Sequence, residues 1–289
     1  MRMLCASRRN EIMSCEIINT KLGKIEYYSE GKGVPVLFVH GGHSNCHEFL
    51  CKKGFDLEKF HLIIPSRPGY GRTPLDNTKT PKQAANLIIE LLNHLSIDNV
   101  IVYGISAGGL TAIELAANYP DRVKKLILAS AVSKRWLDED EKIYKITQII
   151  FNPKTERITW GIVRIFSKIF PYMIAKSFYT QFSKNPIHKL KMKDIQELLL
   201  SMKHYNSKMG FLNDISQNIN VEILKNIKCS TLIIHSKNDN SVPFEHALYS
   251  KKMIENTKLI ELNNEWGHLF WIGTDSKKSI EKTIEFIEE

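Results

Sequence analysis

Short apolar runs alternate along this chain with segments of helical periodicity. Six of these runs, rich in β-branched and other apolar residues, predict buried strands. They span 34–39, 61–65, 100–102, 123–129, 231–235 and 258–262. Apolar residues recur at helical spacing from Pro81 to Ser96 and again from Ser276 to Ile287, which predicts helices. Strands that alternate with helices indicate an α/β fold built on a mostly parallel, doubly wound sheet.

Two shorter runs at the start of the chain predict an N-terminal hairpin. They cover 15–20 and 24–29 and turn at Leu22-Gly23, a combination typical of paired antiparallel strands. We expect 1–14, which has three arginines and no apolar stretch of its own, to be an N-terminal tail rather than a secretory signal.

The strand pattern stops at Ser133 and resumes near Cys229. The intervening residues, 133–228, are helical in pattern, aromatic and basic. This predicts a helical cap inserted into a core that is formed by 15–132 and 229–289.

One stripe within the predicted cap has strong helical periodicity. Its apolar members are Ile158, Ile162, Ile165, Phe166, Ile169 and Met173. Such a stripe usually packs on a core; it can also cover an apolar substrate pocket, or dock on a membrane when basic residues accompany it. We favour the pocket, with Trp160 and Phe166 setting acyl-chain preference.

Charge and cysteine content narrow the class of protein. The formal net charge is +9, and 133–212 carries 15 basic against 7 acidic residues, so the excess lies in one segment. That segment has no nucleic-acid motif, and we expect no nucleic-acid partner. No apolar run is long enough to span a bilayer, so no stable membrane insertion is expected. Five cysteines without a C-x-x-C motif indicate reduced thiols in a cytoplasmic protein.

The chemistry of the chain centres on Gly104-Ile105-Ser106-Ala107-Gly108. This G-x-S-x-G sequence lies between a predicted strand and a predicted helix, the context of a nucleophile elbow. Small flanking residues are needed there because the backbone turns sharply. Ser106 is therefore the predicted nucleophile.

A serine needs a base and a residue that orients the base. On this fold they follow in the order acid and then histidine, after later strands. Asp239 follows the strand at 231–235, and His268 follows the last strand. His246, the other histidine after Asp239, falls within a predicted helix. We therefore predict a triad of Ser106, Asp239 and His268.

Two backbone N–H groups should hold the oxyanion. One belongs to Ala107, directly after the nucleophile. The second should come from the glycine pair that follows the strand at 34–39, and Gly42 is the predicted donor. A glycine pair there also suits an ordinary turn.

These motifs together resemble the α/β-hydrolase fold superfamily, in the branch of capped esterases, lactonases and carbon–carbon bond hydrolases. The residues that carry the resemblance are HGG at 40–42, SRPGYGRT at 66–73, GISAGG at 104–109, Asp239 before Val242-Pro243, and Trp266-Gly267-His268. Ser106 in place of an aspartate disfavours haloalkane dehalogenases and epoxide hydrolases. His43, where Pro-Gly or a third glycine would stand, disfavours proline iminopeptidases and ring-cleavage hydrolases.

The sequence thus predicts a serine hydrolase that cleaves a small or medium, apolar carboxylic ester or lactone through an acyl-enzyme. No metal or organic cofactor is implied. Three alternatives remain: a hydrolase-like small-molecule receptor with a partner protein, an interfacial lipase, and a carbon–carbon bond hydrolase.

Overall fold

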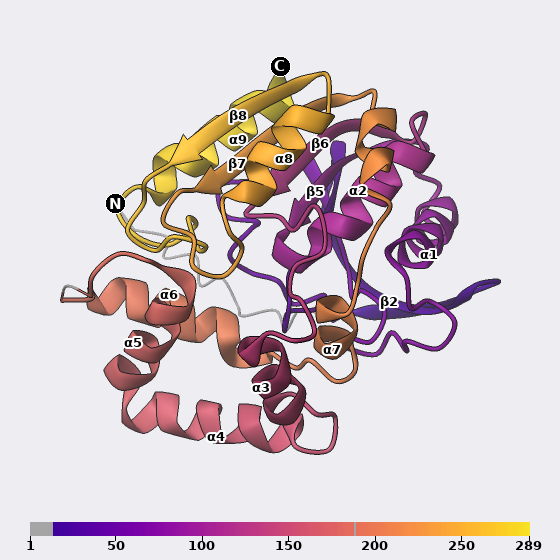
Figure 1. Ribbon diagram of the computed structural model, residues 1–289. Coiled ribbons are helices and arrows are strands. Elements are labelled where there is room, and N and C mark those ends of the chain that lie inside the picture. Colours follow the sequence, from indigo (N-terminus) through magenta and orange to yellow (C-terminus); the bar gives the residue numbers. More distant parts are fainter. Residues whose placement is uncertain (1–13, 188) are drawn as a thin grey trace, which may run out of the picture.

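The computed structural model describes residues 14–187 and 189–289, so all but the last residue of the predicted tail, 1–14, lies outside the described residues. An eight-stranded sheet forms the centre, in the order β1-β2-β4-β3-β5-β6-β7-β8 (Figure 1). Its strands are β1 (Glu16–Thr20), β2 (Gly23–Gly31), β3 (Val34–Val39), β4 (Phe60–Pro65), β5 (Val100–Ile105), β6 (Val123–Ala129), β7 (Ser230–Ser236) and β8 (Thr257–Leu262). β2 pairs antiparallel with β1 and β4, and all other neighbours are parallel. The predicted hairpin and mostly parallel sheet are confirmed.

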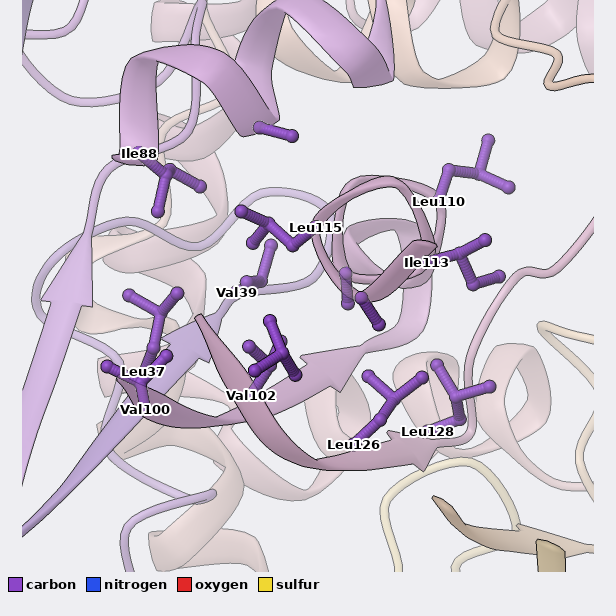
Figure 2. Packing of buried hydrophobic residues seen from close by; sticks show 14 of the residues in the cluster. Leu37, Val39, Ile88, Val100, Val102, Leu110, Ile113, Leu115, Leu126 and Leu128 are labelled. Carbon is purple, nitrogen blue, oxygen red and sulfur yellow. The ribbon is translucent and has the colours of Figure 1, made fainter. Parts of the chain in front are cut away.

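Helices cover both faces of the sheet, which explains why its strands are almost continuously apolar. Those of the core are α1 (Pro81–His94), α2 (Gly109–Asn118), α8 (Glu245–Met253) and α9 (Ser276–Glu288). Val102 packs in the cluster under α1 and α2, which Figure 2 shows from close by. Its neighbour Ile101 joins the cluster on the opposite face, together with Phe286 of α9. Alternation along β5 thus anchors the segment that leads to Ser106 in two hydrophobic layers.

The described residues between β6 and β7 form helices and turns and contribute no strand to the sheet (Figure 1). The helices are α3 (Lys142–Ile150), α4 (Glu156–Ile169), α5 (Pro171–Phe182), α6 (Met192–Ser201) and α7 (Gly210–Ile215). We call this part, residues 133–228, the inserted segment. Trp160, Tyr179 and Ile195 from three of its helices are buried in the hydrophobic cluster on one face of the sheet. The inserted segment therefore packs on the core instead of forming a separate core.

The orientation of α4 differs from the expectation that its apolar stripe covers a pocket. Ile158, Ile162, Ile165 and Ile169 are 51–63% exposed, whereas Trp160 is 2% exposed. Trp160 lies on the other side of α4 because it is offset from the stripe by about half a turn. The side of α4 that faces the protein is thus the one with Trp160, and the isoleucine stripe faces solvent.

A disulfide joins Cys15, just before β1, to Cys46, in the loop after β3. The expectation that all cysteines are reduced thiols is wrong for this pair. Cys51 and Cys229 are free, and Cys5 lies outside the described residues. The bridge depends on tertiary proximity across 31 positions, which cysteine spacing does not reveal. The cysteine count therefore no longer argues for a reducing compartment.

Candidate active site

Ser106 lies at the sharp turn between β5 and α2. Its φ of 49° is in the left-handed region, which costs a non-glycine residue conformational energy. The turn closes tightly around it. A Cβ on Gly104 would lie 2.5 Å from Cβ of Ala112, and a Cβ on Gly108 would lie 2.2 Å from the Val39 carbonyl oxygen. Only glycine fits at either position, which explains the spacing of the motif.

The loop after β3 approaches Ser106 closely. A Cβ on Gly41 would lie 3.0 Å from Cβ of Ser106 and 3.6 Å from its Oγ. Gly42 follows in the same loop, and a Cβ there would lie 2.9 Å from the ring of Phe211. The structure thus brings the glycine pair beside the predicted nucleophile, and Phe211 of the inserted segment lies over Gly42.

Asp239 is fully buried in the loop after β7. Its Oδ1 accepts hydrogen bonds from the backbone N–H groups of Ser241 and Val242, both at 2.8 Å. Its Oδ2 lies 2.7 Å from Nδ1 of His268. The backbone bonds fix the carboxylate, so its second oxygen is held toward the imidazole.

The same Oδ2 has a second histidine partner that the sequence motifs do not mark. Nε2 of His235, at the end of β7, lies 3.1 Å from Oδ2 of Asp239 and 2.9 Å from the carbonyl oxygen of Val242. Burial alone would raise the pKa of Asp239. The charge of His268 and the hydrogen bonds from both histidines outweigh burial and lower this pKa to about 2. Asp239 is therefore ionised at neutral pH.

His268 lies in the loop after β8, directly after Gly267. Gly267 has a φ of +53°, and a Cβ there would lie 2.4 Å from the carbonyl oxygen of Phe182. The ring of Phe182 stacks on His268 with 5.7 Å between centroids. Because Nδ1 of His268 bonds to Asp239, its Nε2 is the nitrogen left for proton transfer.

Backbone bonds hold the loops of the site together. The carbonyl oxygen of Phe182, at the end of α5, accepts the N–H groups of His268 at 2.9 Å and Asn240 at 3.2 Å. Ser130, just after β6, donates from Oγ to the His268 carbonyl oxygen at 3.0 Å. Two residues further on, the N–H of Val132 donates to the carbonyl oxygen of Ser106 at 2.9 Å. The segment after β6 thus connects the serine turn to the histidine loop.

His40 forms a hydrogen bond to the first residue of the glycine pair, Gly41 and Gly42. Its Nε2 accepts the N–H of Arg67 at 2.9 Å, so its Nδ1 carries the proton and donates to the carbonyl oxygen of Gly41 at 2.7 Å. Burial and the nearby charge of Arg67 hold the pKa of His40 well below its usual value. Arg67 in turn forms a bidentate pair with Asp214 of α7, with both contacts at 2.7 Å. This buried ion pair couples the glycine loop to the inserted segment.

His43 extends the site into the inserted segment. Its ring lies 3.8 Å from that of Phe211, 4.4 Å from Phe151 and 5.1 Å from Trp160, measured between centroids. Desolvation by these rings lowers the pKa of His43 to about 3, so the imidazole is neutral. Its Nδ1 bonds to Oγ of Ser207. The surroundings of Gly42 are therefore aromatic and uncharged.

The cavity that borders Ala107 is small. A cavity beside Ala107 and Thr111 has a volume of about 20 Å³, enough for a water molecule. A larger cavity of about 400 Å³ is lined by Lys53, Glu197 and Ile280, and none of the predicted site residues borders it. Ser106 and His268 are 6% and 4% exposed, so the site is closed in this conformation.

A grouping of possible metal ligands lies apart from the predicted triad. Atoms of Cys15, Cys46 and His47 lie within 4.8 Å of one another. Because Cys15 and Cys46 form a disulfide, neither supplies the thiolate that a metal ion would require.

Comparison with known proteins shows to which family this chain belongs. Residues 34–150 match the model of the alpha/beta hydrolase fold. YcgS of Bacillus subtilis, an uncharacterized hydrolase, is 37% identical over 279 residues, which are 94% of this chain and 98% of YcgS. An alpha/beta hydrolase fold protein from Nakamurella multipartita is 25% identical with a TM-score of 0.76, covering 94% of this chain and 98% of its own.

An esterase (EaEST) from Exiguobacterium antarcticum has a TM-score of 0.73 at 23% identity, covering 94% of this chain and 99% of its own. At that identity the likeness concerns the fold. The match to YcgS extends over nearly the full length of both proteins. On this evidence the protein is a hydrolase that belongs to the α/β-hydrolase fold family.

Proposed function

We propose that this protein is a serine hydrolase that cleaves carboxylic esters or lactones through Ser106, His268 and Asp239. Oγ of Ser106 attacks the substrate carbonyl carbon while Nε2 of His268 takes its proton. His268 then returns that proton to the departing alkoxide, which leaves an acyl group on Ser106. Water then attacks the acyl group with His268 again acting as the base; His268 returns this proton to Oγ of Ser106 as the acid product departs.

The single observation that carries this proposal is the contact between His268 and Asp239. Nδ1 of His268 lies 2.7 Å from a carboxylate that is buried and held by two backbone N–H groups. This arrangement fixes the tautomer with the free lone pair on Nε2 and stabilises the imidazolium that forms during attack. Together with the strained turn that holds Ser106, it supplies a base and a hydroxyl for nucleophilic catalysis.

We assign the oxyanion hole to the backbone N–H groups of Gly42 and Ala107. Ala107 starts the turn into α2, and Gly42 follows the glycine that closely approaches Ser106. Two such donors typically contribute a factor of about 10²–10³ each to kcat. The bond from His40 to the carbonyl oxygen of Gly41 keeps this loop in place.

The inserted segment acts, in this proposal, as a cap that encloses the substrate. The rings around His43 belong to its elements, and the closed site has little room beside Ala107. Substrate entry therefore requires the cap to move, as lids do in many enzymes. The aromatic rings around His43 favour an apolar substituent on the ester or lactone.

Fluorophosphonate labelling tests this function. The wild-type protein should be labelled covalently and should hydrolyse p-nitrophenyl butyrate with multiple turnovers. Ser106→Ala should abolish both. Ser216→Ala, which changes an exposed serine directly after α7, should be labelled like the wild type. Labelling without turnover would instead indicate a hydrolase-like receptor, and unchanged labelling of Ser106→Ala would refute the nucleophile assignment.

A further inference from the structure

Three helices of the inserted segment expose many large apolar side chains. Eight of these side chains, on α3, α4 and α5, are 43–73% exposed. We call them the outer apolar face: Ile143, Ile146, Ile149, Ile158, Ile162, Ile165, Ile169 and Met173. Large clusters of exposed apolar residues mark interaction sites more often than ordinary surface.

The spacing of residues along α4 explains its part of the outer apolar face. Ile158, Ile162, Ile165 and Ile169 are spaced by four, three and four residues, so they form one continuous stripe. The opposite side of the same helix buries Trp160 against the aromatic cluster around His43. Figure 1 shows α4 at the edge of the molecule, on the side of the inserted segment away from the sheet. In the part of the chain that the structure describes, more than half of each side chain in the stripe is therefore left uncovered.

All exposed charges of these three helices and their short connections are positive. Six exposed cations lie between 142 and 182: Lys142, Lys145, Lys154, Arg157, Lys168 and Lys176. Within the described parts of the chain none of them forms an ion pair. The one acidic residue in this range, Glu156, is 2% exposed and accepts the backbone N–H of Ser207. The run of acids at 138–141 ends before α3 begins.

We propose that the outer apolar face and its unpaired cations dock this protein on a bilayer that contains anionic phospholipid. Isoleucines would enter the boundary between headgroups and acyl chains, and lysines and arginines would meet the phosphates. The helices would lie in the plane of the interface. Within the described residues no helix has the length and apolar character to cross a bilayer, which suits peripheral docking.

The charge pattern argues against a second copy of the chain as the occupant. Two copies meeting through this face would bring two sets of unpaired cations together, and the one carboxylate within 142–182, that of Glu156, is buried; burying unpaired charges is costly. A surface rich in phosphate neutralises them instead. An anionic bilayer therefore meets both the apolar and the cationic part of the face.

Docking would also place the membrane against the outer side of α4. The inner side of α4 contacts the candidate active site. Trp160 reaches His43, which directly follows Gly42. An ester dissolved in the bilayer would thus lie against the outer side of the cap. This consequence depends on the proposed function, whereas the docking itself does not.

Sedimentation with vesicles tests docking without a substrate. The full chain is mixed with vesicles of phosphatidylcholine alone, or of phosphatidylcholine with about one-third phosphatidylglycerol. We expect the protein to pellet with the anionic vesicles and to remain in solution with the neutral ones. Raising the salt from about 0.1 M to about 1 M should release much of it, because the Debye length falls from about 10 Å to 3 Å.

Paired variants locate the contact. Ile162→Gln with Ile165→Gln should lower binding to anionic vesicles by about tenfold or more, because two side chains lose their burial in the bilayer. Leu248→Gln on α8, where Leu248 is 49% exposed, is the matched control and should bind like the wild type. Arg157→Gln with Lys168→Gln should weaken binding by about fivefold for each charge removed, whereas Lys252→Gln should not.

Three results would overturn the proposal. The first is that the wild type remains in solution with anionic vesicles. The second is that the Ile162→Gln and Ile165→Gln double variant binds as well as Leu248→Gln. The third is that ultracentrifugation shows a dimer that this double variant dissociates while vesicles bind neither protein, which would assign the face to a second copy. None of these outcomes depends on whether Ser106 is catalytic.

Discussion

His235 and His268 share one oxygen atom of Asp239. Oδ2 lies 2.7 Å from Nδ1 of His268 and 3.1 Å from Nε2 of His235, and both rings are buried. Nδ1 of His235 has no hydrogen-bond partner in the described part of the chain. His235 thus contributes one N–H group, which it divides between Asp239 and the carbonyl oxygen of Val242.

We predict that His235 positions Asp239 and tunes its bond to His268. In His235→Leu, Oδ2 loses one donor and bonds more strongly to His268, which favours the imidazolium. The acid limb of the pH profile of kcat/KM should move to higher pH, and kcat should fall by about tenfold. In His235→Gln the amide N–H replaces Nε2–H and should restore the profile. A purely structural role would leave the acid limb in place in both variants.

Asp239→Asn should lower kcat by about 10⁴ while the fold is retained. The remaining amide oxygen can still accept the N–H groups of Ser241 and Val242. The amide NH₂ then faces Nδ1 of His268, which must switch tautomer and lose its free lone pair at Nε2. Steady-state kinetics with p-nitrophenyl butyrate, together with circular dichroism, measure the effect. Near wild-type kcat in this variant would mean that another carboxylate orients the base.

Substitutions of Trp160 and Phe166 should have different effects on acyl-chain preference. Trp160 faces the aromatic cluster, whereas Phe166 is 41% exposed. Trp160→Ala should shift the ratio of kcat/KM for octanoate over butyrate esters by about tenfold, since each added methylene in a fitted pocket is discriminated. Phe166→Ala should leave this ratio unchanged. Trp160→Phe, which keeps an aromatic ring, provides a milder variant if the alanine variant unfolds.

The buried pair of Arg67 and Asp214 should be costly to break. Asp214→Ala leaves a buried guanidinium without its carboxylate and should lower the free energy of unfolding by about 3–5 kcal/mol. Arg67→Met combined with Asp214→Leu should recover most of this loss, because no charge then remains buried. Urea unfolding of the two variants measures the difference. Equal losses in both would show that packing, not charge, is what Asp214 supplies.

His43 should make the protein sensitive to mild acid. Its pKa is lowered to about 3 in the folded state, against about 6.5 when unfolded. Between these values the unfolded chain binds a proton that the folded chain does not, so stability falls as pH decreases from about 6.5 to 3. The contribution is at most about 1.4 kcal/mol per pH unit.

His43→Asn removes this titration and keeps a residue that tolerates the φ of 64° found there. The difference in unfolding free energy between wild type and variant should therefore change with pH over that window and be constant above pH 7. A difference that is independent of pH throughout would show that His43 titrates normally.

The strands and the turn at Ser106 could be foreseen because they depend on local signals, whereas the triad itself stays a prediction. β5 alternates between two buried faces, and Gly104 and Gly108 are the residues that a tight strand-to-helix turn requires. Asp239 and His268 were located because loops after parallel strands meet at one edge of the sheet.

The remaining features depend on contacts between residues that are far apart in the sequence, which the spacing of motifs does not reveal. The pairing of Cys15 with Cys46, of Arg67 with Asp214 and of His235 with Asp239 follows from packing alone. The stripe on α4 was assigned to the wrong side for a related reason. An apolar stripe normally marks the buried face, and nothing local to Ile162 shows that Trp160 anchors the opposite side.

The φ of 49° at Ser106 also restricts how this protein could evolve. A β-branched side chain is strongly disfavoured in that region of backbone space, whereas aspartate and asparagine enter it more readily. Threonine, although it carries the same hydroxyl, is thus a poor substitute at this turn. Aspartate suits this backbone and would place a carboxylate where the proposed nucleophilic hydroxyl lies. A single substitution at position 106 can therefore change the chemistry of this fold only if the new residue tolerates a positive φ.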